Sequence, residues 1–239
     1  MHIRFADPGD AAACLAVYAQ YIDTSITFET VLPSEAEFSG RIRSYGAVYP
    51  WLIAEEDGRV LAYAYAHRAQ ERAAYGWNAE LSVYVSRDAA GRGLGTKLYT
   101  VLLALLQKQG VRTAYGVVTM PNDASSALHQ KLGFRTLGTY HNTGYKNGRW
   151  LDVVWFEKPI GSFTSRSPSP PSPGSRTPPP SSQPPTHKPT PAPRRQKQRG
   201  ARRFRQGKHR NTQEATQSCP RCNQYVVYFL QNIHVKSGV

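Results

Sequence analysis

Hydrophobic and polar positions recur along the chain with two periods, one typical of helices and one typical of strands. Asp7 can cap a helix whose first position is Pro8, and apolar residues then follow at helical spacing as far as Ile22. Ser34 begins a capping-box pattern, which predicts a second helix that ends near Tyr45. The N-terminal part of the chain is therefore predicted to contain two consecutive helices.

Strand patterns follow these helices. Trp51–Glu56 and Arg59–Ala66 are apolar runs separated by Asp57-Gly58, a dipeptide typical of a tight hairpin turn. Apolar and polar residues then alternate over Glu80–Val85, as in a strand with one buried face. The later segments predict a helix over Leu94–Gln109, a strand over Arg112–Met120, a short helix over Ser125–Leu132, and strands over Phe134–Tyr140 and Trp150–Lys158, joined by a loop that contains Asn142, Gly144 and Gly148.

The order of the predicted elements, with a strand at the N-terminus, is β-α-α-β-β-β-α-β-α-β-β. A strand–helix–strand crossover lies inside an otherwise antiparallel pattern. This order predicts an α/β (α+β) fold, with a mixed, mostly antiparallel central sheet and helices on both of its faces.

Charge divides the chain of 239 residues into two parts. Residues 1–163 carry 16 Lys and Arg against 15 Asp and Glu, whereas residues 164–239 carry 14 Lys and Arg against Glu214 alone. The net charge of +14 therefore belongs almost entirely to the second part and says nothing about a ligand of the first. We predict a single folded domain over residues 1–163.

Composition predicts no folded domain beyond that point. Residues 164–193 are rich in Pro, Ser and Thr and are expected to form a disordered linker, because such a segment buries too little apolar surface to offset the entropy of ordering. Residues 194–239 form a basic tail, also expected to be disordered, and any binding of nucleic acid is expected through this tail alone. Cys219 and Cys222 form a single C-x-x-C pair, which does not give a standard zinc site, so no metal is expected.

The cysteines, the N-terminus and the hydropathy all favour the cytoplasm. Three cysteines do not make a disulfide framework, and Cys14 lies in an apolar helical stripe, where core packing is expected. Residues 1–10 contain no apolar run of the kind that a signal peptide needs, and no segment approaches the roughly 18 apolar residues of a membrane span. We therefore expect a soluble cytoplasmic protein that does not bind membranes.

Three alternate glycines join a predicted strand to a predicted helix in the segment Gly91-Arg92-Gly93-Leu94-Gly95-Thr96. Glycine permits close approach of the backbone, and free N–H groups at a helix start bind anions, so this segment predicts a pyrophosphate site. Thr96 stands where the dinucleotide-binding pattern needs its third glycine, and the spacing before Lys97 does not fit a Walker A loop. A glycine turn that serves packing alone is the alternative.

This loop and three further segments resemble the GCN5-related N-acetyltransferase (GNAT) superfamily, and within it the phosphinothricin and methionine-sulfoximine N-acetyltransferase branch. The further segments are Ala79–Ser86, Asn122–Phe134 and Gly144–Val153, and the resemblance covers about residues 2–158. Two positions depart from the family pattern. Ala90 replaces the Gln or Arg that opens the phosphate loop, and Asn147 replaces a histidine that is usual in the phosphinothricin enzymes, which leaves phosphinothricin open as an acceptor.

The resemblance implies a GNAT domain that uses acetyl-CoA as a co-substrate and acetylates the amino group of a small amino acid or amino-acid-like toxin. It implies that Glu80 is the general base, because the acceptor nitrogen must lose a proton in the reaction. His129 occupies the position of an acid for the departing sulfur; a half-buried histidine with satisfied hydrogen bonds is the alternative.

The same resemblance implies further contacts. Acetyl-CoA is expected to meet Val83, Tyr84, Val85, Gly91, Arg92, Gly93, Leu94, Gly95, Thr96, Asn122 and Ser125. The acceptor amine is expected to meet Phe28, Tyr75, Glu80 and Asn122. A helix cap is the alternative for Asn122, and a place in the core is the alternative for Tyr75.

Two other functions remain open at this point. One is an acetyltransferase whose acceptor is a peptide or protein amine, and the other is a non-catalytic GNAT scaffold that carries a nucleic-acid-binding tail. Glu80 and the glycine loop are both intact, which favours the enzyme. A homodimer is a further expectation, because dimers are common in the branch that the chain resembles.

Overall fold

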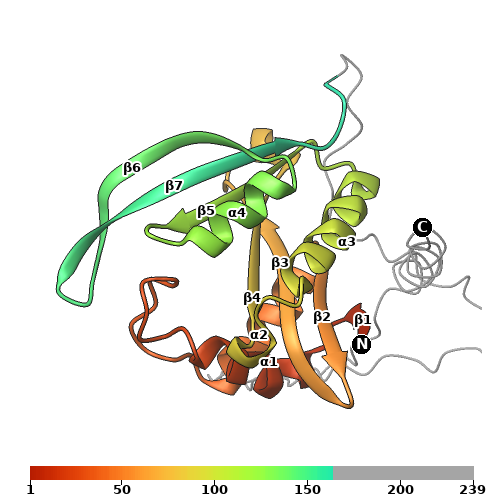
Figure 1. Ribbon diagram of the computed structural model, residues 1–239. Helices are drawn as coiled ribbons and strands as arrows, with labels where there is room; N and C mark the ends of the chain where they lie inside the picture. Colours follow the sequence, from red (N-terminus) through yellow and green to blue (C-terminus); the bar gives the residue numbers. More distant parts are fainter. Residues whose placement is uncertain (164–239) are drawn as a thin grey trace, which may run out of the picture. The chain divides into compact units, whose positions relative to one another are not determined.

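The computed structural model describes residues 1–163. The linker predicted over residues 164–193 and the basic tail predicted over residues 194–239, with Cys219 and Cys222, lie outside the described residues. The described part is built on one seven-stranded sheet with the strand order β1-β2-β3-β4-β5-β7-β6 (Figure 1).

The sheet is mixed. Its strands are β1 (His2–Phe5), β2 (Trp51–Glu56), β3 (Arg59–Arg68), β4 (Asn78–Val85), β5 (Thr113–Thr119), β6 (Arg135–Lys146) and β7 (Arg149–Pro159). All neighbouring strands pair antiparallel except β4 and β5, which are parallel because a helix carries the chain from one to the other. The mixed, mostly antiparallel sheet that the element order predicts is confirmed.

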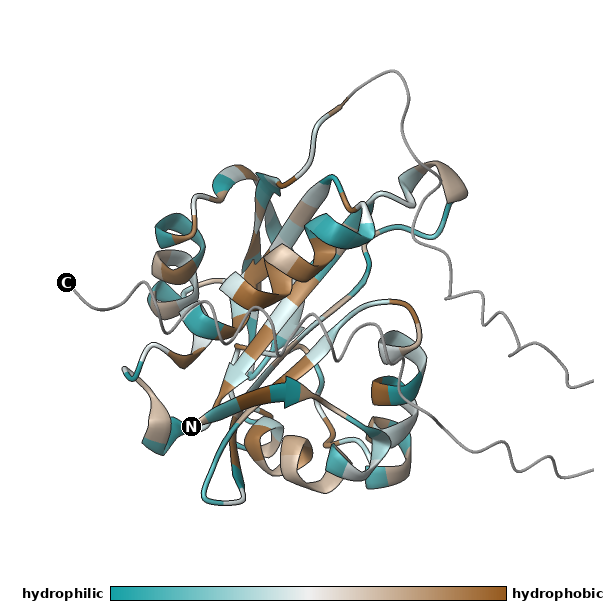
Figure 2. Cartoon of the chain, turned by 90° about the vertical axis from the view of Figure 1, so that its right-hand side faces the viewer, coloured by the Kyte–Doolittle hydropathy of each residue, from teal (hydrophilic) through white to brown (hydrophobic). Residues whose placement is uncertain are grey.

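Helices cover both faces of the sheet, as predicted. The α-helices are α1 (Ala11–Ala19), α2 (Glu35–Gly46), α3 (Leu94–Gln109) and α4 (Asp123–Lys131), and short 3₁₀ turns span Pro8–Asp10, Ala73–Tyr75 and Arg87–Ala89. Alternation along β3 separates two cores, because Ala62 and Ala64 pack with α3 whereas Tyr63 packs with α1 and α2. Figure 2 shows hydrophobic residues concentrated on the strands and on the helices packed against them. Within residues 1–163, no helix is long and apolar enough to cross a membrane.

Several elements match their sequence patterns closely. α3 has the predicted bounds. Ser34 caps α2, since its hydroxyl oxygen accepts the Glu37 N–H at 3.2 Å. Asp57 and Gly58 make the turn between β2 and β3 with φ values of 51° and 76°. Each of these features depends on residues close together in the chain.

The first helix differs from its predicted form at both ends. Asp7 does cap the chain, but the turn that it caps is a 3₁₀ turn, and α1 begins after that turn. α1 ends at Ala19 rather than near Ile22, because the chain continues in turns in which the Tyr21 N–H donates to the Tyr18 carbonyl. The loop that leads to α2 is correspondingly longer than the periodicity suggests.

β6 and β7 form a longer hairpin than the sequence predicts. The predicted loop after Tyr140 is strand as far as Lys146, with a bulge between Tyr140 and Gly144. Asn147 and Gly148 make the turn, with φ values of 53° and 77°. An Asn-Gly pair with two positive φ values is typical of a two-residue hairpin turn, so the prediction of a loop was wrong at this point.

β4 and β5 separate part of the way along their length. Their parallel pairing runs from Asn78 and Thr113 to Leu81 and Gly116. Beyond that point β4 continues to Val85 beside β3, and β5 continues beside β7. Figure 1 shows β4 and β5 pointing in different directions from this opening, which we term the β4–β5 fork.

Candidate functional site

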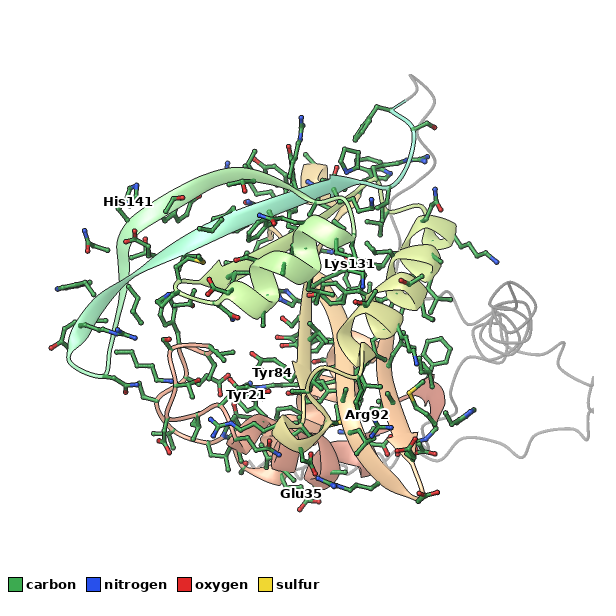
Figure 3. The ribbon with its side chains drawn as sticks, viewed as in Figure 1. Tyr21, Glu35, Tyr84, Arg92, Lys131 and His141 are labelled. Carbon is green, nitrogen blue, oxygen red and sulfur yellow. The ribbon has the colours of Figure 1, made fainter. Side chains whose placement is uncertain are left out.

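The β4–β5 fork leaves one edge of β4 open. Val83 and Tyr84 pair with β3 on one side, and no other strand of the described part pairs with them on the other side. Val85 differs, because the Tyr21 hydroxyl donates to its carbonyl oxygen. The rings of Tyr21 and Tyr84 lie 5.8 Å apart, and Figure 3 shows the two side chains close together. The open edge therefore offers the backbone groups of Val83 and Tyr84 to an extended ligand, as a sheet edge does in strand addition.

The glycine loop leads from β4 into the start of α3. Gly91 and Gly93 have φ values of 78° and 74°, which explains why glycine stands at both positions. The Lys97 N–H donates to the Gly93 carbonyl at 3.0 Å, so the N–H groups of the three residues before Lys97 have no partner in the preceding turn of the helix. The first turn of α3 has neither a capping side chain nor an acidic residue. This arrangement suits an anion.

Gly95 brings the start of α3, the open strand and α4 together. A methyl group at this position would lie 3.4 Å from a side-chain carbon of Leu128 on α4 and 3.9 Å from one of Val83 on β4. The start of α3 therefore packs directly beside the open edge of β4. An anion held at the helix start is thus next to the β4–β5 fork.

Two ion pairs hold the glycine loop and the 3₁₀ turn before it against the β2–β3 hairpin. Arg92 Nη2 lies 2.8 Å and 3.0 Å from the two carboxylate oxygens of Glu56, and Arg59 Nη2 lies 2.6 Å from Oδ2 of Asp88. These side chains line a hollow of about 300 Å³. The hydrogen bond from Arg92 holds the pKa of Glu56 below its usual value. Figure 3 labels Arg92, whose Nη2 makes both of these contacts with Glu56.

Glu80 lies on β4, one residue before the last pair that β4 makes with β5. Its register partners are His67 on β3 and Tyr115 on β5. Its side chain is 22% exposed, and its Oε1 lies 3.6 Å from Nε2 of His67. Burial raises the pKa of Glu80, and the charge of His67 opposes that shift. A carboxylate with a raised pKa beside an opening in the sheet is suited to accept a proton near neutral pH.

Asn122 and Ser125 shape the start of α4. The Asn122 Oδ1 accepts the Ser125 N–H at 3.1 Å, so Asn122 caps the helix. This is the structural alternative that the sequence left open for Asn122. The Ser125 side chain is half-buried, and its hydroxyl lies 3.5 Å from Nδ1 of His129. The structure therefore brings three of the predicted site residues together on one short helix.

His129 is enclosed by other side chains. It is 2% exposed, its ring stacks on Phe156 with the ring centroids 4.9 Å apart, and a methyl group on Gly116 would lie 2.0 Å from its Nε2. Its Nδ1 lies 2.8 Å from the Ser125 carbonyl and therefore carries the proton, while Nε2 has no hydrogen-bond partner among the described residues. Burial lowers the pKa of His129, which keeps the ring neutral. These contacts favour a packing role over the acid at the sulfur that the resemblance implied.

The loop between α1 and α2 is fastened to the turn of the β6–β7 hairpin. Lys146 is 5% exposed, and its ammonium group donates to the carbonyl oxygens of Ile22, Thr27 and Glu29 at 2.6, 2.7 and 2.7 Å. Three donors of one ammonium group thus meet three acceptors of one loop. Figure 1 shows this loop reaching toward the end of the hairpin.

Two aromatic side chains predicted to meet the acceptor lie at the surface. Phe28 belongs to the α1–α2 loop, is 40% exposed, and packs so closely on Gly144 of β6 that a methyl group there would lie 2.3 Å from Phe28 Cζ. Tyr75 is 41% exposed and ends the 3₁₀ turn just before β4. Tyr75 is therefore not a core residue, and both rings are open to a ligand. Asn147 donates to the carbonyl of Asp23 at 2.9 Å, so its amide helps to hold the loop that carries Phe28.

Three side chains that shape this site carry no signal in the amino-acid sequence. Tyr21 lies just beyond α1, His67 lies in β3, and Lys146 lies in a segment that reads as a loop. Each makes its contact with a residue more than ten positions away in the chain, with Val85, Glu80 and the α1–α2 loop respectively. No local pattern marks such residues.

Other features of the described residues lie outside this site. Cys14 is fully buried in the core, as predicted, and burial raises the pKa of its thiol to about 12. A hollow of about 510 Å³ lies beside the second half of α3 and is lined mainly by Leu103, Gln107 and Lys158–Ser162, none of which is a predicted site residue. Within residues 1–163, no group of three or more His, Cys, Asp or Glu side chains is placed to hold a metal ion.

The chain matches a known family over most of its described part. Residues 3–155 match the model of the family described as "Acetyltransferase (GNAT) domain". This span contains β4, the glycine loop, α4, the whole of β6 and the first part of β7.

Named relatives are similar over nearly their whole length. The chain is 37% identical over 174 residues to a phosphinothricin N-acetyltransferase of Streptomyces viridochromogenes, covering 72% of this chain and 92% of the relative. It is 34% identical over 161 residues to an L-methionine sulfoximine/L-methionine sulfone acetyltransferase of Pseudomonas paraeruginosa, covering 65% and 92%. Among solved structures, a phosphinothricin acetyltransferase of Sinorhizobium meliloti in complex with acetyl-CoA matches with a TM-score of 0.67 and 34% identity, covering 70% of this chain and 92% of that one.

Proposed function

Since the chain belongs to the GNAT acetyltransferase family, we propose that this N-acetyltransferase transfers the acetyl group of acetyl-CoA to the α-amino group of a small amino acid or amino-acid-like toxin. Two relatives are named for phosphinothricin and methionine sulfoximine, both of which carry such an amino group. The nearly balanced charge of residues 1–163 gives no support for a strongly charged acceptor.

The donor fits the start of α3 and the open edge of β4. The N–H groups of the first helical turn and the backbone at Gly91 and Gly93 suit its diphosphate, because no acidic or capping side chain competes there. The unpaired edge at Val83 and Tyr84 suits the amide groups of its pantetheine arm. Acetyl-CoA supplies an activated thioester, and the chain has to hold that thioester next to the acceptor amine.

Glu80 is the base in this proposal. An α-amino group is largely protonated at neutral pH, with a pKa of roughly 7.7–8.0, and it must lose a proton to react. A carboxylate with an ordinary pKa is a weak base for this step, and the burial of Glu80 makes it a stronger one. The single observation that carries the proposal is the position of this carboxylate, one residue before β4 and β5 separate.

The acceptor is assigned to the face of the sheet on which Glu80 lies. On β4, Glu80 and Tyr84 alternate with Leu81, so they share the face covered by α1 and α2. The α1–α2 loop brings the exposed ring of Phe28 to this side, and Tyr75 precedes the same strand. His129 has no proton-transfer step in this proposal, because its ring is enclosed and neutral.

A thiol-release assay tests the proposal. The purified protein is incubated with acetyl-CoA and a panel of amino acids that includes methionine, methionine sulfoximine and phosphinothricin. We expect thiol release with at least one of these acceptors, and mass spectrometry should find the acetyl group on its nitrogen. A protein that releases no thiol above the rate of hydrolysis with any member of the panel contradicts the proposal.

A further inference from the structure

His67 and Glu80 face each other across two neighbouring strands. They are direct partners in the antiparallel register of β3 and β4, so their side chains emerge on the same face of the sheet. Nε2 of His67 lies 3.6 Å from Oε1 of Glu80, and the two side chains are 25% and 22% exposed. The imidazole is therefore close to the carboxylate and partly exposed to solvent.

A backbone carbonyl fixes the tautomer of His67. Its Nδ1 lies 3.0 Å from the carbonyl oxygen of Arg68. A carbonyl oxygen only accepts hydrogen bonds, so Nδ1 carries a proton in both charge states of the ring. In the neutral ring, Nε2 consequently presents a lone pair to Glu80, and in the cationic ring it presents an N–H group.

Tyrosine side chains surround Glu80 and His67, and they bear on where a proton on Glu80 can go. Tyr115 faces Glu80 as its register partner on β5, and burial raises the pKa of Tyr115. The rings of Tyr45 on α2 and Tyr65 on β3 lie 5.4 Å and 6.0 Å from the ring of His67. Burial also raises the pKa of Tyr65 and of Tyr99, a residue of α3 on the opposite face whose pKa the charge of Glu80 raises further. These phenols hold their protons at neutral pH, so His67 is the neighbour of Glu80 whose ring nitrogen offers a lone pair that can accept a proton.

We propose that His67 is a positioning and proton-relay residue, which orients the carboxylate of Glu80 and passes to solvent the proton that Glu80 takes from the acceptor amine. The inference rests on the proposed function, since it assigns a fate to that proton. An N–H bond of the acceptor breaks, its electron pair stays on nitrogen, and an O–H bond forms on Glu80. The two partly exposed side chains then close the 3.6 Å gap to hydrogen-bond distance, the O–H bond of Glu80 breaks as an N–H bond forms at Nε2 of His67, and the imidazolium passes the proton to water. No other co-reactant is needed.

The pH profile of kcat/KM tests the relay with a matched pair of variants. His67→Gln removes the imidazole that faces Glu80, and His141→Gln removes one that faces a carboxylate elsewhere, since His141 Nδ1 lies 2.9 Å from Asp152 on the β6–β7 hairpin. In the pH profile of kcat/KM for His67→Gln, we expect the acid limb to move to higher pH and the plateau to fall roughly tenfold. We expect the His141→Gln profile to match the wild type. A His67→Gln profile that keeps the wild-type limb and plateau overturns the inference.

Chemical rescue separates a relay from a purely structural role. His67→Ala opens space at a partly exposed position, so added imidazole can take the place of the missing ring. We expect imidazole to restore several-fold activity to His67→Ala and none to Glu80→Gln. Rescue of neither variant, with both folded by circular dichroism, contradicts the relay.

A measurement without turnover keeps this inference separate from the proposed function. The carboxyl carbon of Glu80 is titrated by NMR in ¹³C-labelled wild type and His67→Gln, with Glu80→Gln to assign the signal. We expect a higher pKa of Glu80 in His67→Gln, because the cation that lowers it is gone. An unchanged pKa overturns the coupling even in an active enzyme, whereas a raised pKa in a protein without acetyl transfer overturns only the proposed function.

Discussion

The ammonium group of Lys146 lies 2.7 Å from the backbone carbonyl of Thr27, although 119 positions separate the two residues in the chain. The same ammonium group binds two further carbonyls of the α1–α2 loop. A charge buried in this way is stabilised because each of its three protons has an acceptor. The contact ties the loop that carries Phe28 to the β6–β7 hairpin, and so it fixes one wall of the proposed acceptor site.

Removal of this ammonium group should destabilise the protein. Lys146→Met leaves three loop carbonyls without their donor, and we expect the free energy of unfolding to fall by about 3 kcal/mol. Urea denaturation measures the change. Lys131→Met, at an exposed position of α4 labelled in Figure 3, serves as the control and should stay within about 0.5 kcal/mol of the wild type. Equal effects of the two substitutions would show that the three hydrogen bonds do not stabilise the fold.

Gly93 offers a test of the proposed diphosphate site. Gly93 and Gly58 have nearly the same φ, 74° and 76°, and a methyl group at either position would meet no other atom within 4 Å. Gly93→Ala and Gly58→Ala should therefore each cost about 1 kcal/mol of stability through backbone strain. We expect the KM for acetyl-CoA to rise roughly tenfold in Gly93→Ala alone, which corresponds to about 1.4 kcal/mol of lost binding. An equal rise of the KM in both variants would contradict a diphosphate site at Gly93.

The absence of a side chain at Gly116 leaves room for the ring of His129, so a side chain at this position should destabilise the protein. The Cβ of an alanine there would lie 2.0 Å from His129 Nε2, so the ring would have to move out of its stack with Phe156. We expect Gly116→Ala to lower the free energy of unfolding by about 1–3 kcal/mol. Gly138→Ala on β6, where a methyl group meets nothing within 4 Å, is the matched control. Thermal unfolding followed by circular dichroism compares the two, and a Gly116→Ala protein as stable as the control would contradict this packing.

Glu80 should also affect how the stability of the folded protein depends on pH. Its pKa is raised in the folded protein, so the folded state binds a proton there more tightly than the unfolded state does. The stabilisation that the protonated Glu80 gives to the folded state is complete below the pKa that Glu80 has in the unfolded chain. It is lost as the pH rises through the pKa that Glu80 has in the folded protein. Glu80→Gln removes the buried charge, and we expect this variant to melt at a higher temperature than the wild type at pH 7.

The comparison at low pH provides the check. Below the unfolded pKa of Glu80 the wild-type side chain is neutral in both states, so the two melting temperatures should converge. Glu71→Gln, at an exposed position, serves as the control and should follow the wild type at both pH values. A gap between Glu80→Gln and the wild type that is the same at both pH values would rule out a pH-linked contribution from this carboxylate.

The acid role for His129 illustrates what a sequence motif leaves undecided. The motif places a histidine on a short helix, and the helix forms where predicted. Whether that histidine faces the fork or the core depends on Gly116 and Phe156, which belong to two other strands. Glu80 is the opposite case, because it lies beside the fork as the resemblance implied, but its partner His67 carries no signal in the sequence.

Elements whose form depends on neighbours in the chain could be predicted from the amino-acid sequence alone. Apolar periodicity predicted both ends of α3 correctly. Asp57-Gly58 predicted the β2–β3 turn, and three glycines predicted the loop at the start of α3. Each of these signals arises from residues a few positions apart. Two other features arise only when the chain folds: the register that sets His67 against Glu80, and the contact that buries Lys146 against the α1–α2 loop. Those contacts join residues that only the folded sheet brings together, and burial and charge, which set the pKa of Glu80, arise from them.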